Sequence, residues 1–113
     1  MDCLFCKIVA KKFPAKIIFE DEKMIAFEDV NPQAPVHVLV VPKKHISTVL
    51  EIDPADNDLV GHMFQVAGNI SRKRNIADRG FRLVMNCNSE AGQTVFHIHL
   101  HMLGGRPMQW PPG

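Results

Sequence analysis

The most regular alternation of apolar and polar positions in this chain lies in residues 96–103. Three histidines there alternate with aliphatic residues, in the order Phe96-His-Ile-His-Leu-His-Met-Leu103. Successive side chains of a β-strand point to opposite faces, so the pattern predicts a strand with its three imidazoles on one face. The aliphatic residues would share the other face and point toward a core. A helix would scatter the same residues around its axis.

Four further segments have the apolar content of strands, namely 16–20, 24–28, 36–41 and 81–86. A short polar turn joins the first two, which predicts a hairpin. The third is mostly apolar and β-branched, as is typical of a central strand buried on both faces. Two prolines within residues 29–35 predict a loop before that strand.

A long helix is predicted to begin near Asp53, a suitable N-cap that is followed by Pro54 at the first helical position. A buried stripe at helical spacing is formed by Leu59, Met63, Val66, Ala67 and Ile70. A short helix is predicted within residues 7–10. Five strands in hairpin connections, with one long and one short helix, indicate an α+β fold with a mainly antiparallel sheet.

The composition is that of a single domain spanning residues 1–113, with an N-terminal segment at 1–12 and a tail at 104–113. A formal net charge of +1 provides no field that would favour nucleic acid or an anionic membrane. The basic run at 72–74 is better explained as a solvated helix end. There is no apolar run of membrane-spanning length and no signal-peptide core. We therefore expect a cytoplasmic protein without nucleic-acid or membrane partners.

Polar residues near the histidine-rich segment predict an anion-binding pocket. In the loop before it, Gly92 allows close approach of backbone N–H groups, and Gln93 and Thr94 supply side-chain donors. Asn86 ends the preceding strand. His37 interrupts an apolar strand, where a polar group without a partner would be costly. These groups predict a phosphate site with an imidazole nucleophile, and a merely exposed polar face is the alternative.

The three cysteines are Cys3, Cys6 and Cys87, an odd number that argues against a disulfide framework in a chain without a secretion signal. The Cys-x-x-Cys spacing of the first two suits either redox chemistry or a metal. No βαβ pattern supports a thioredoxin-like motif. We expect Cys87 to be a bystander thiol.

The histidine-rich segment resembles the motif His-φ-His-φ-His-φ-φ, with φ apolar, of the histidine-triad (HIT) superfamily. The resemblance covers nearly the whole chain. Residues 3–9, 27–37 and 41–47 are similar to the opening and the central signature of that family. The ending at 104–113 resembles the Hint branch, the nucleoside phosphoramidate hydrolases, rather than the Fhit-like dinucleotide hydrolases.

The resemblance implies a hydrolase of purine nucleoside 5′-phosphoramidates that releases a nucleoside monophosphate and an amine through a nucleotidyl-histidine intermediate. His99 would be the nucleophile, His101 would contact the phosphoryl oxygens, and the His97 carbonyl would fix the His99 tautomer. His37 would support the triad, and Thr94 would lie on the leaving-group side. Nucleotide contacts are implied for Asp29, Val30, Asn86, Gly92, Gln93, Thr94, Val95, His99 and His101. A dinucleoside polyphosphate hydrolase or nucleotidyl transferase, or a nucleotide-binding regulatory module with little turnover, are the alternatives.

The resemblance also implies a structural zinc ion held by Cys3, Cys6, His45 and His97, and no organic cofactor. Such a Cys₂His₂ set leaves no open coordination position. It further implies a homodimer with one continuous ten-stranded sheet. In that dimer, the tail with Trp110 would reach the active site of the partner subunit.

Overall fold

The computed structural model describes residues 2–113, which form a five-stranded antiparallel sheet in the order β1-β2-β3-β5-β4. The strands are β1 (Ile17–Glu20), β2 (Met24–Glu28), β3 (Val36–Pro42), β4 (Phe81–Val84) and β5 (Leu100–Gly104). The α-helices are α1 (Leu4–Val9) and α2 (Asn57–Lys73), and the 3₁₀ turns are η1 (Val49–Glu51), η2 (Pro54–Asp56) and η3 (Ser89–Ala91). The predicted α+β fold is confirmed. Within residues 2–113, no helix has both the length and the apolar character needed to cross a membrane.

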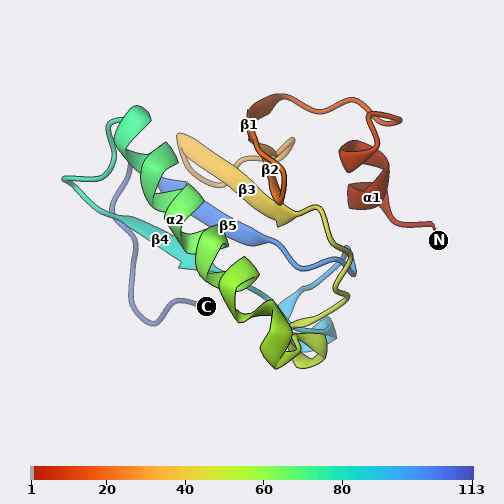
Figure 1. Cartoon of the computed structure of the whole chain (residues 1–113). Coiled ribbons are helices and arrows are strands. Elements are labelled where there is room, and N and C mark those ends of the chain that lie inside the picture. Colours follow the sequence, from red (N-terminus) through yellow and green to blue (C-terminus); the bar gives the residue numbers. More distant parts are fainter. Residues whose placement is uncertain (1) are drawn as a thin grey trace.

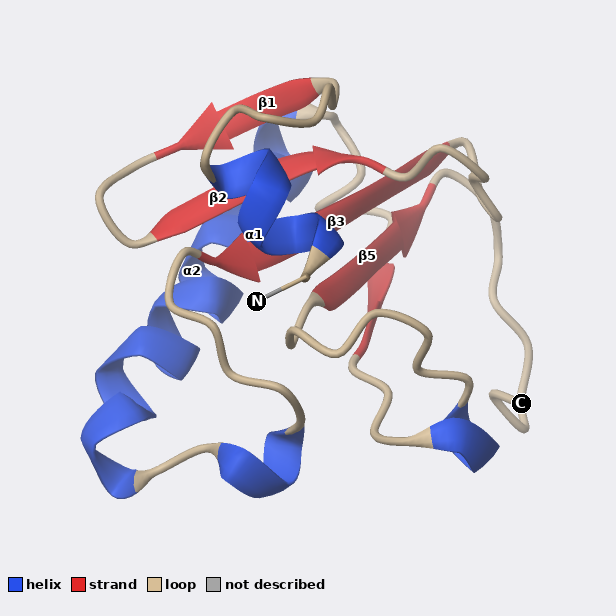
Figure 2. Ribbon diagram, turned by 90° about the vertical axis from the view of Figure 1, so that its right-hand side faces the viewer, coloured by secondary structure: helices blue, strands red, loops and turns tan. Residues whose placement is uncertain are grey.

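The two α-helices cover opposite faces of the sheet (Figures 1 and 2). The larger core lies under α2, whose apolar stripe meets Met24, Ala26, Val38, Val40, Leu100 and Met102. The smaller core lies under α1, where Phe5 and Ile8 meet Ile25, Phe27, Leu39 and Val41. The central strand β3 is therefore buried on both faces, as its apolar sequence predicts. Burial of each large aliphatic side chain stabilises the fold by about 1.5–3 kcal/mol.

Side-chain caps mark the start of α1 and of the 3₁₀ turn η2, which leads into α2. The Sγ atom of Cys3 accepts from Cys6 N at 3.4 Å, so α1 starts at Leu4, ahead of the predicted residues 7–10. Asp53 is an N-cap, as predicted, but the turn that it caps is the 3₁₀ turn η2 and not the first turn of α2. Asp56 closes a capping box there, since its carboxylate accepts from Asp53 N at 3.0 Å. The α-helical geometry of α2 follows directly.

The histidine-rich segment is a strand only from Leu100 onward, although the alternation predicts a strand over 96–103. In the continuing β3–β5 register, Pro42 lies opposite Ile98 and has no N–H for the ladder. Ile98 N instead donates to Ile46 O at 2.7 Å. The predicted division of faces is still present: Ile98, Leu100 and Met102 are buried under α2, and the three histidines lie on the face that α1 covers.

Candidate active site

One ring nitrogen of His99 is available as a nucleophile. His99 Nδ1 lies 2.8 Å from the carbonyl oxygen of His97. Because a carbonyl only accepts, Nδ1 carries the proton and the lone pair is on Nε2. Burial lowers the pKa of His99, which favours the neutral ring. The edge of Phe5 packs against this ring, with the ring centroids 4.9 Å apart.

His37 and His101 form a hydrogen-bond chain with a defined direction. Gln33 N–H donates to His37 Nδ1 at 3.0 Å, so the neutral ring of His37 carries its proton on Nε2. His37 Nε2 donates to His101 Nδ1 at 2.9 Å, and the neutral ring of His101 therefore carries its proton on Nε2. This Nε2 atom is buried and has no hydrogen-bond partner within residues 2–113. Since a buried unpaired N–H is costly, we interpret it as a donor for a ligand.

The two rings of this chain are neutral at neutral pH. Burial lowers the pKa of His101 to about 4, and the neighbouring His99 and His37 act in the same direction. Burial also lowers the pKa of His37. Asp29 opposes both shifts, and its Oδ2 lies 3.4 Å from His37 Nε2. A neutral His101 keeps one donor and places no cation beside the nucleophile.

His99 and His101 open into a cleft of about 440 Å³ on the face of the sheet that α1 covers. Most of the residues predicted to contact a nucleotide line it, namely Asp29, Val30, Asn86, Gly92, Thr94 and Val95. An apolar floor that the sequence analysis did not predict is formed by Phe5, Ile8, Phe27 and Leu39. An apolar cleft with a few converging polar groups is the usual form of a small-molecule site.

Asp29 and Val30 lie at the rim of this cleft, directly after β2. Asp29 Oδ1 accepts from Asn31 N at 2.8 Å, which holds the loop in a tight turn. Its side chain retains 19% exposure. Val30 is 99% exposed, so its whole apolar surface is available to a ligand.

Gln93 lies behind the cleft lining. Its side chain is buried: Nε2 donates to Ser47 O at 2.8 Å and Val95 O at 3.2 Å, and Oε1 accepts from Asn88 N at 2.9 Å. Its amide therefore fixes the shape of the loop. Gly92 has φ +87°, a left-handed conformation that favours glycine, so it too shapes this loop.

The four predicted metal ligands come together between α1 and the sheet. Their ligand atoms all lie within 4.8 Å of one another. His97 Nε2 donates to Pro42 O at 2.7 Å, which leaves the lone pair of His97 on Nδ1, facing the cysteines. His97 Nδ1 is 3.5 Å from Cys3 Sγ, 3.5 Å from Cys6 Sγ and 3.1 Å from His45 Nδ1.

These separations fit a tetrahedral ion. Zn–S bonds of about 2.3 Å and Zn–N bonds of about 2.0–2.1 Å give ligand–ligand edges of about 3.5 Å for S–N and about 3.3 Å for N–N. The observed S–N distances include 3.3 Å between Cys6 Sγ and His45 Nδ1. The cluster Cys3/Cys6/His45/His97 could therefore hold a metal ion such as zinc.

A second group of potential ligands, Asp29, His37 and His101, also lies within 4.8 Å. Its protons argue against a metal. Because the N–H of Gln33 occupies His37 Nδ1, the other nitrogen of that ring carries a proton instead of a lone pair. We interpret this group as a hydrogen-bond chain.

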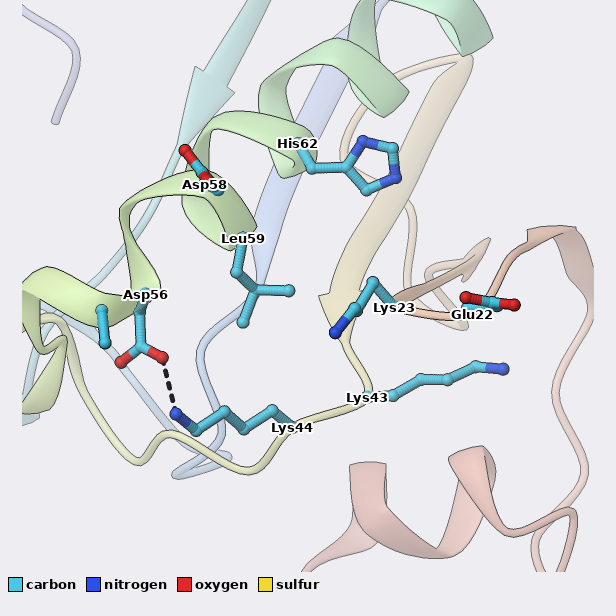
Figure 3. A pocket seen from close by; sticks show the side chains of 9 residues that line it. Glu22, Lys23, Lys43, Lys44, Asp56, Asp58, Leu59 and His62 are labelled. Atoms are coloured by element: carbon cyan, nitrogen blue, oxygen red, sulfur yellow. Dashed lines mark hydrogen bonds and ion pairs between the residues drawn. The ribbon is translucent and has the colours of Figure 1, made fainter.

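Another cleft, of about 770 Å³, lies away from His99 and His101, between the β1–β2 turn, the end of β3 and the start of α2, where His62 is one of the residues that line it (Figure 3). Charges of both signs line it, and Lys44 Nζ lies 2.6 Å from Asp56 Oδ1 within the cleft (Figure 3). Lys43 Nζ lies 2.7 Å from Oε2 of Glu20, a residue outside the cleft lining. These two lysines directly precede His45, so their ion pairs help to hold the segment that carries this metal ligand.

The tail returns to its own sheet. Arg82 Nη2, on β4, donates to Gln109 O at 3.0 Å. Trp110 follows and is 82% exposed. The homodimer, and the contact of this tail with the partner subunit, stay predictions.

Sequence reasoning missed three residues that orient the histidines. Pro42 and Gln33 act through backbone groups, which leave no signal in the side-chain pattern. Phe5 packs edge-on against both His97 and His99. Its position between the two cysteines was an available signal, because a metal shared with the histidine-rich segment would place α1 over that segment.

Comparisons with known proteins agree with this geometry. A family model described as scavenger mRNA decapping enzyme C-term binding matches residues 2–110. An uncharacterized HIT-like protein of Synechocystis sp. is 51% identical over 112 residues, which are 99% of this chain and 97% of that protein. The crystal structure of a HIT family hydrolase from Legionella pneumophila Philadelphia 1 matches with a TM-score of 0.98 at 47% identity, over 99% of this chain and 100% of that one. A histidine triad nucleotide-binding protein from Candida albicans matches with a TM-score of 0.83 at 27% identity, over 97% and 83% of the two chains.

Proposed function

The chain belongs to the HIT superfamily, and from that premise we propose that this HIT family hydrolase cleaves purine nucleoside 5′-phosphoramidates. One observation carries the proposal. A nitrogen lone pair on His99 and an N–H donor on His101, unpaired within the described part of the chain, lie on neighbouring rings of one cleft, with ring centroids 5.0 Å apart. A nucleophile beside a donor suits attack on a phosphoryl group.

In the proposed first step, His99 Nε2 attacks the α-phosphorus. A bond forms between that nitrogen and phosphorus as the bond from phosphorus to the amine breaks, and the amine leaves with a proton taken from water. The positive charge that develops on the ring of His99 is stabilised by the His97 carbonyl at Nδ1. His101 Nε2–H donates to a phosphoryl oxygen.

In the second step, water attacks the phosphorus of the nucleotidyl-histidine intermediate and gives a proton to the hydroxide ion that the first step left. The bond between phosphorus and His99 Nε2 breaks, and the nucleoside monophosphate leaves. The nucleotide would be held at the rim, with the ribose hydroxyls on the Asp29 carboxylate and the base on Val30. Asn86 and Thr94, which also line the cleft, would contact the phosphate and the leaving group.

The metal ion in the proposal is zinc, since two cysteines and two histidines form a ligand set that zinc favours. A bound zinc ion would cross-link α1 to the histidine-rich segment. It would have a structural role, because four protein ligands leave no open position for substrate. Its ligand His97 also supplies the carbonyl that orients His99.

The proposal extends to assembly and location. A homodimer with a continuous ten-stranded sheet is supported by the resemblance to the HIT superfamily and by the exposure of Trp110. A cytoplasmic location is supported by the ordinary composition and the net charge of +1. Gel filtration with light scattering would test the dimer.

The catalytic proposal is tested with an adenosine phosphoramidate that releases a fluorescent amine, and with diadenosine polyphosphates in parallel. We expect amine release by the wild type and a loss of at least about 10⁴-fold in kcat for His99→Ala. His62→Ala removes a histidine outside the cleft of His99 and His101, and it should match the wild type. Equal release by His99→Ala would contradict the assignment of the nucleophile. Faster cleavage of the polyphosphates would favour a dinucleotide hydrolase, and binding of AMP without turnover would favour a regulatory module.

A further inference from the structure

We infer that Arg106, in the tail beyond β5, is a positioning residue for the reaction proposed above. It holds the backbone of Gln33, and Gln33 in turn sets the proton positions of His37 and His101. The catalytic consequence of this inference rests on the proposed function, whereas the proton positions can be measured without any substrate.

The contact between Arg106 and Gln33 has a fixed direction. Arg106 Nε and Nη2 both donate to Gln33 O, at 3.1 Å and 2.9 Å. The third nitrogen, Nη1, donates to Pro107 O at 3.0 Å, so the planar guanidinium is itself held in place. Two donors from one rigid plane define the position of the acceptor carbonyl more closely than a single flexible donor could.

Two glycines bring Arg106 to this loop. Gly104 pairs with Val36, so the end of β5 lies beside the start of β3. Gly105 follows with φ +91°, and a Cβ atom built on it would lie 2.9 Å from the Cβ of Pro35. Glycine alone combines this backbone conformation with this close approach. The tail therefore passes directly against the loop that carries Gln33.

The chain from Gln33 to His101 can run in two directions. In the observed direction, Gln33 N–H donates to His37 Nδ1, and His101 is left with its proton on Nε2. If the loop moved away, His37 Nδ1 could take up the ring proton. His37 Nε2 would then accept from His101 Nδ1, and a lone pair instead of an N–H would face the phosphoryl oxygen. Every bond between the rings would be kept, but the donor needed by the substrate would be lost.

The test begins with ¹⁵N-labelled histidine in the full chain. In the wild type, NMR should show a pyridine-like Nδ1 and a pyrrole-like Nε2 in both His37 and His101. In Arg106→Met, both rings should shift toward the reverse pattern. We expect kcat to fall about tenfold, with KM within about twofold, because a donor to the transition state is partly lost. Arg106→Lys keeps the charge but not the two-donor geometry. Its ring proton positions and its kcat should therefore lie between those of the wild type and of Arg106→Met.

Arg82→Met is the matched control. Arg82 also donates to a carbonyl of the tail, at Gln109, but it does not touch Gln33. It should keep the wild-type proton positions and kcat. The inference is overturned if the wild type shows a pyrrole-like Nδ1 in His101, a result that needs no variant. It is also overturned if Arg106→Met leaves both rings and kcat unchanged, or if Arg82→Met has the same effects. A wild type that cleaves no phosphoramidate would refute the proposed function, while the NMR spectra would still decide the proton positions.

Discussion

The two groups of histidines on one face of the sheet present different atoms to what they would bind, although His97, His37 and His101 all carry their ring proton on Nε2. In the Cys3/Cys6/His45/His97 cluster, the ring of His97 turns its lone pair inward, because its other nitrogen donates to Pro42 O. In the chain of His37 and His101, donors and acceptors alternate and end on an N–H that has no partner among residues 2–113. His99 lies between these groups and presents a lone pair to the cleft.

The difference teaches that spacing along the strand does not assign the function of a histidine. The three histidines at 97, 99 and 101 share one face, and burial lowers the pKa of each ring. They differ in the atom that contacts the ring: Pro42 O at His97 Nε2, His97 O at His99 Nδ1, and His37 Nε2 at His101 Nδ1. A carbonyl forces a proton onto the facing nitrogen, and an N–H forces a lone pair there. The fold therefore sets the chemistry of each ring through its neighbours.

The largest effect on stability is expected from breaking the metal cluster. Cys6→Ser should lose the metal measured by elemental analysis and lower the free energy of unfolding by about 4 kcal/mol when free metal is a thousandfold above its Kd. Cys87→Ser removes a thiol outside the cluster and should change neither quantity. If a chelator left the unfolding curve of the wild type unchanged, the structural role of the metal would be refuted.

The chain of His37 and His101 should make stability depend on pH. Burial lowers the pKa of folded His101 to about 4, against about 6.5 in the unfolded chain, so the unfolded state binds more protons between these values. The contribution of the His101 ring to the free energy of unfolding is complete above about pH 7. It is lost as the pH falls toward 4, and the loss amounts to about 3 kcal/mol. Urea unfolding at pH 7 and pH 4, with chelator present, should show a smaller loss of unfolding free energy for His101→Gln than for the wild type. Equal losses would contradict the assignment.

His101→Leu should separate catalysis from stability. Leucine has no N–H group, so the loss of one donor to the transition state is expected to lower kcat about 10²-fold with little change in KM. Cys6→Ser should show the reverse balance, a large effect on stability and a smaller one on kcat at a temperature where it stays folded. If the two variants had the same profile, the two groups would not be functionally distinct.

The smallest effect is expected at Phe5, which contacts His97 of the metal cluster and the neighbouring His99. Phe5→Leu removes its edge contacts with His97 and His99 and should lower the free energy of unfolding by about 1 kcal/mol. Phe13→Leu changes an aromatic ring at the rim of the cleft that is 47% exposed, and should have almost no effect. Thermal melts of the two variants would make the comparison.

The sequence predicts the sheet and its faces well, because apolar alternation survives in the core. The strand 24–28 and the stripe of α2 are confirmed. The late start of β5 could not be found from the alternation alone. It depends on Pro42 in the paired strand β3, which is far away along the sequence. The tautomer of His37 was equally hidden, because the backbone N–H of any residue other than proline at position 33 could supply the same bond.

The contacts that complete the site join residues that are far apart along the chain. The contact from Cys3 to His97 spans 94 positions, and that from Gln33 to Arg106 spans 73. During synthesis, the ribosome must therefore release residue 97 before the four metal ligands can meet, and residue 106 before the loop at Gln33 is held. Such long-range closures are slow steps of folding. Metal uptake by a nascent chain would thus mark the moment at which the histidine-rich segment joins the sheet.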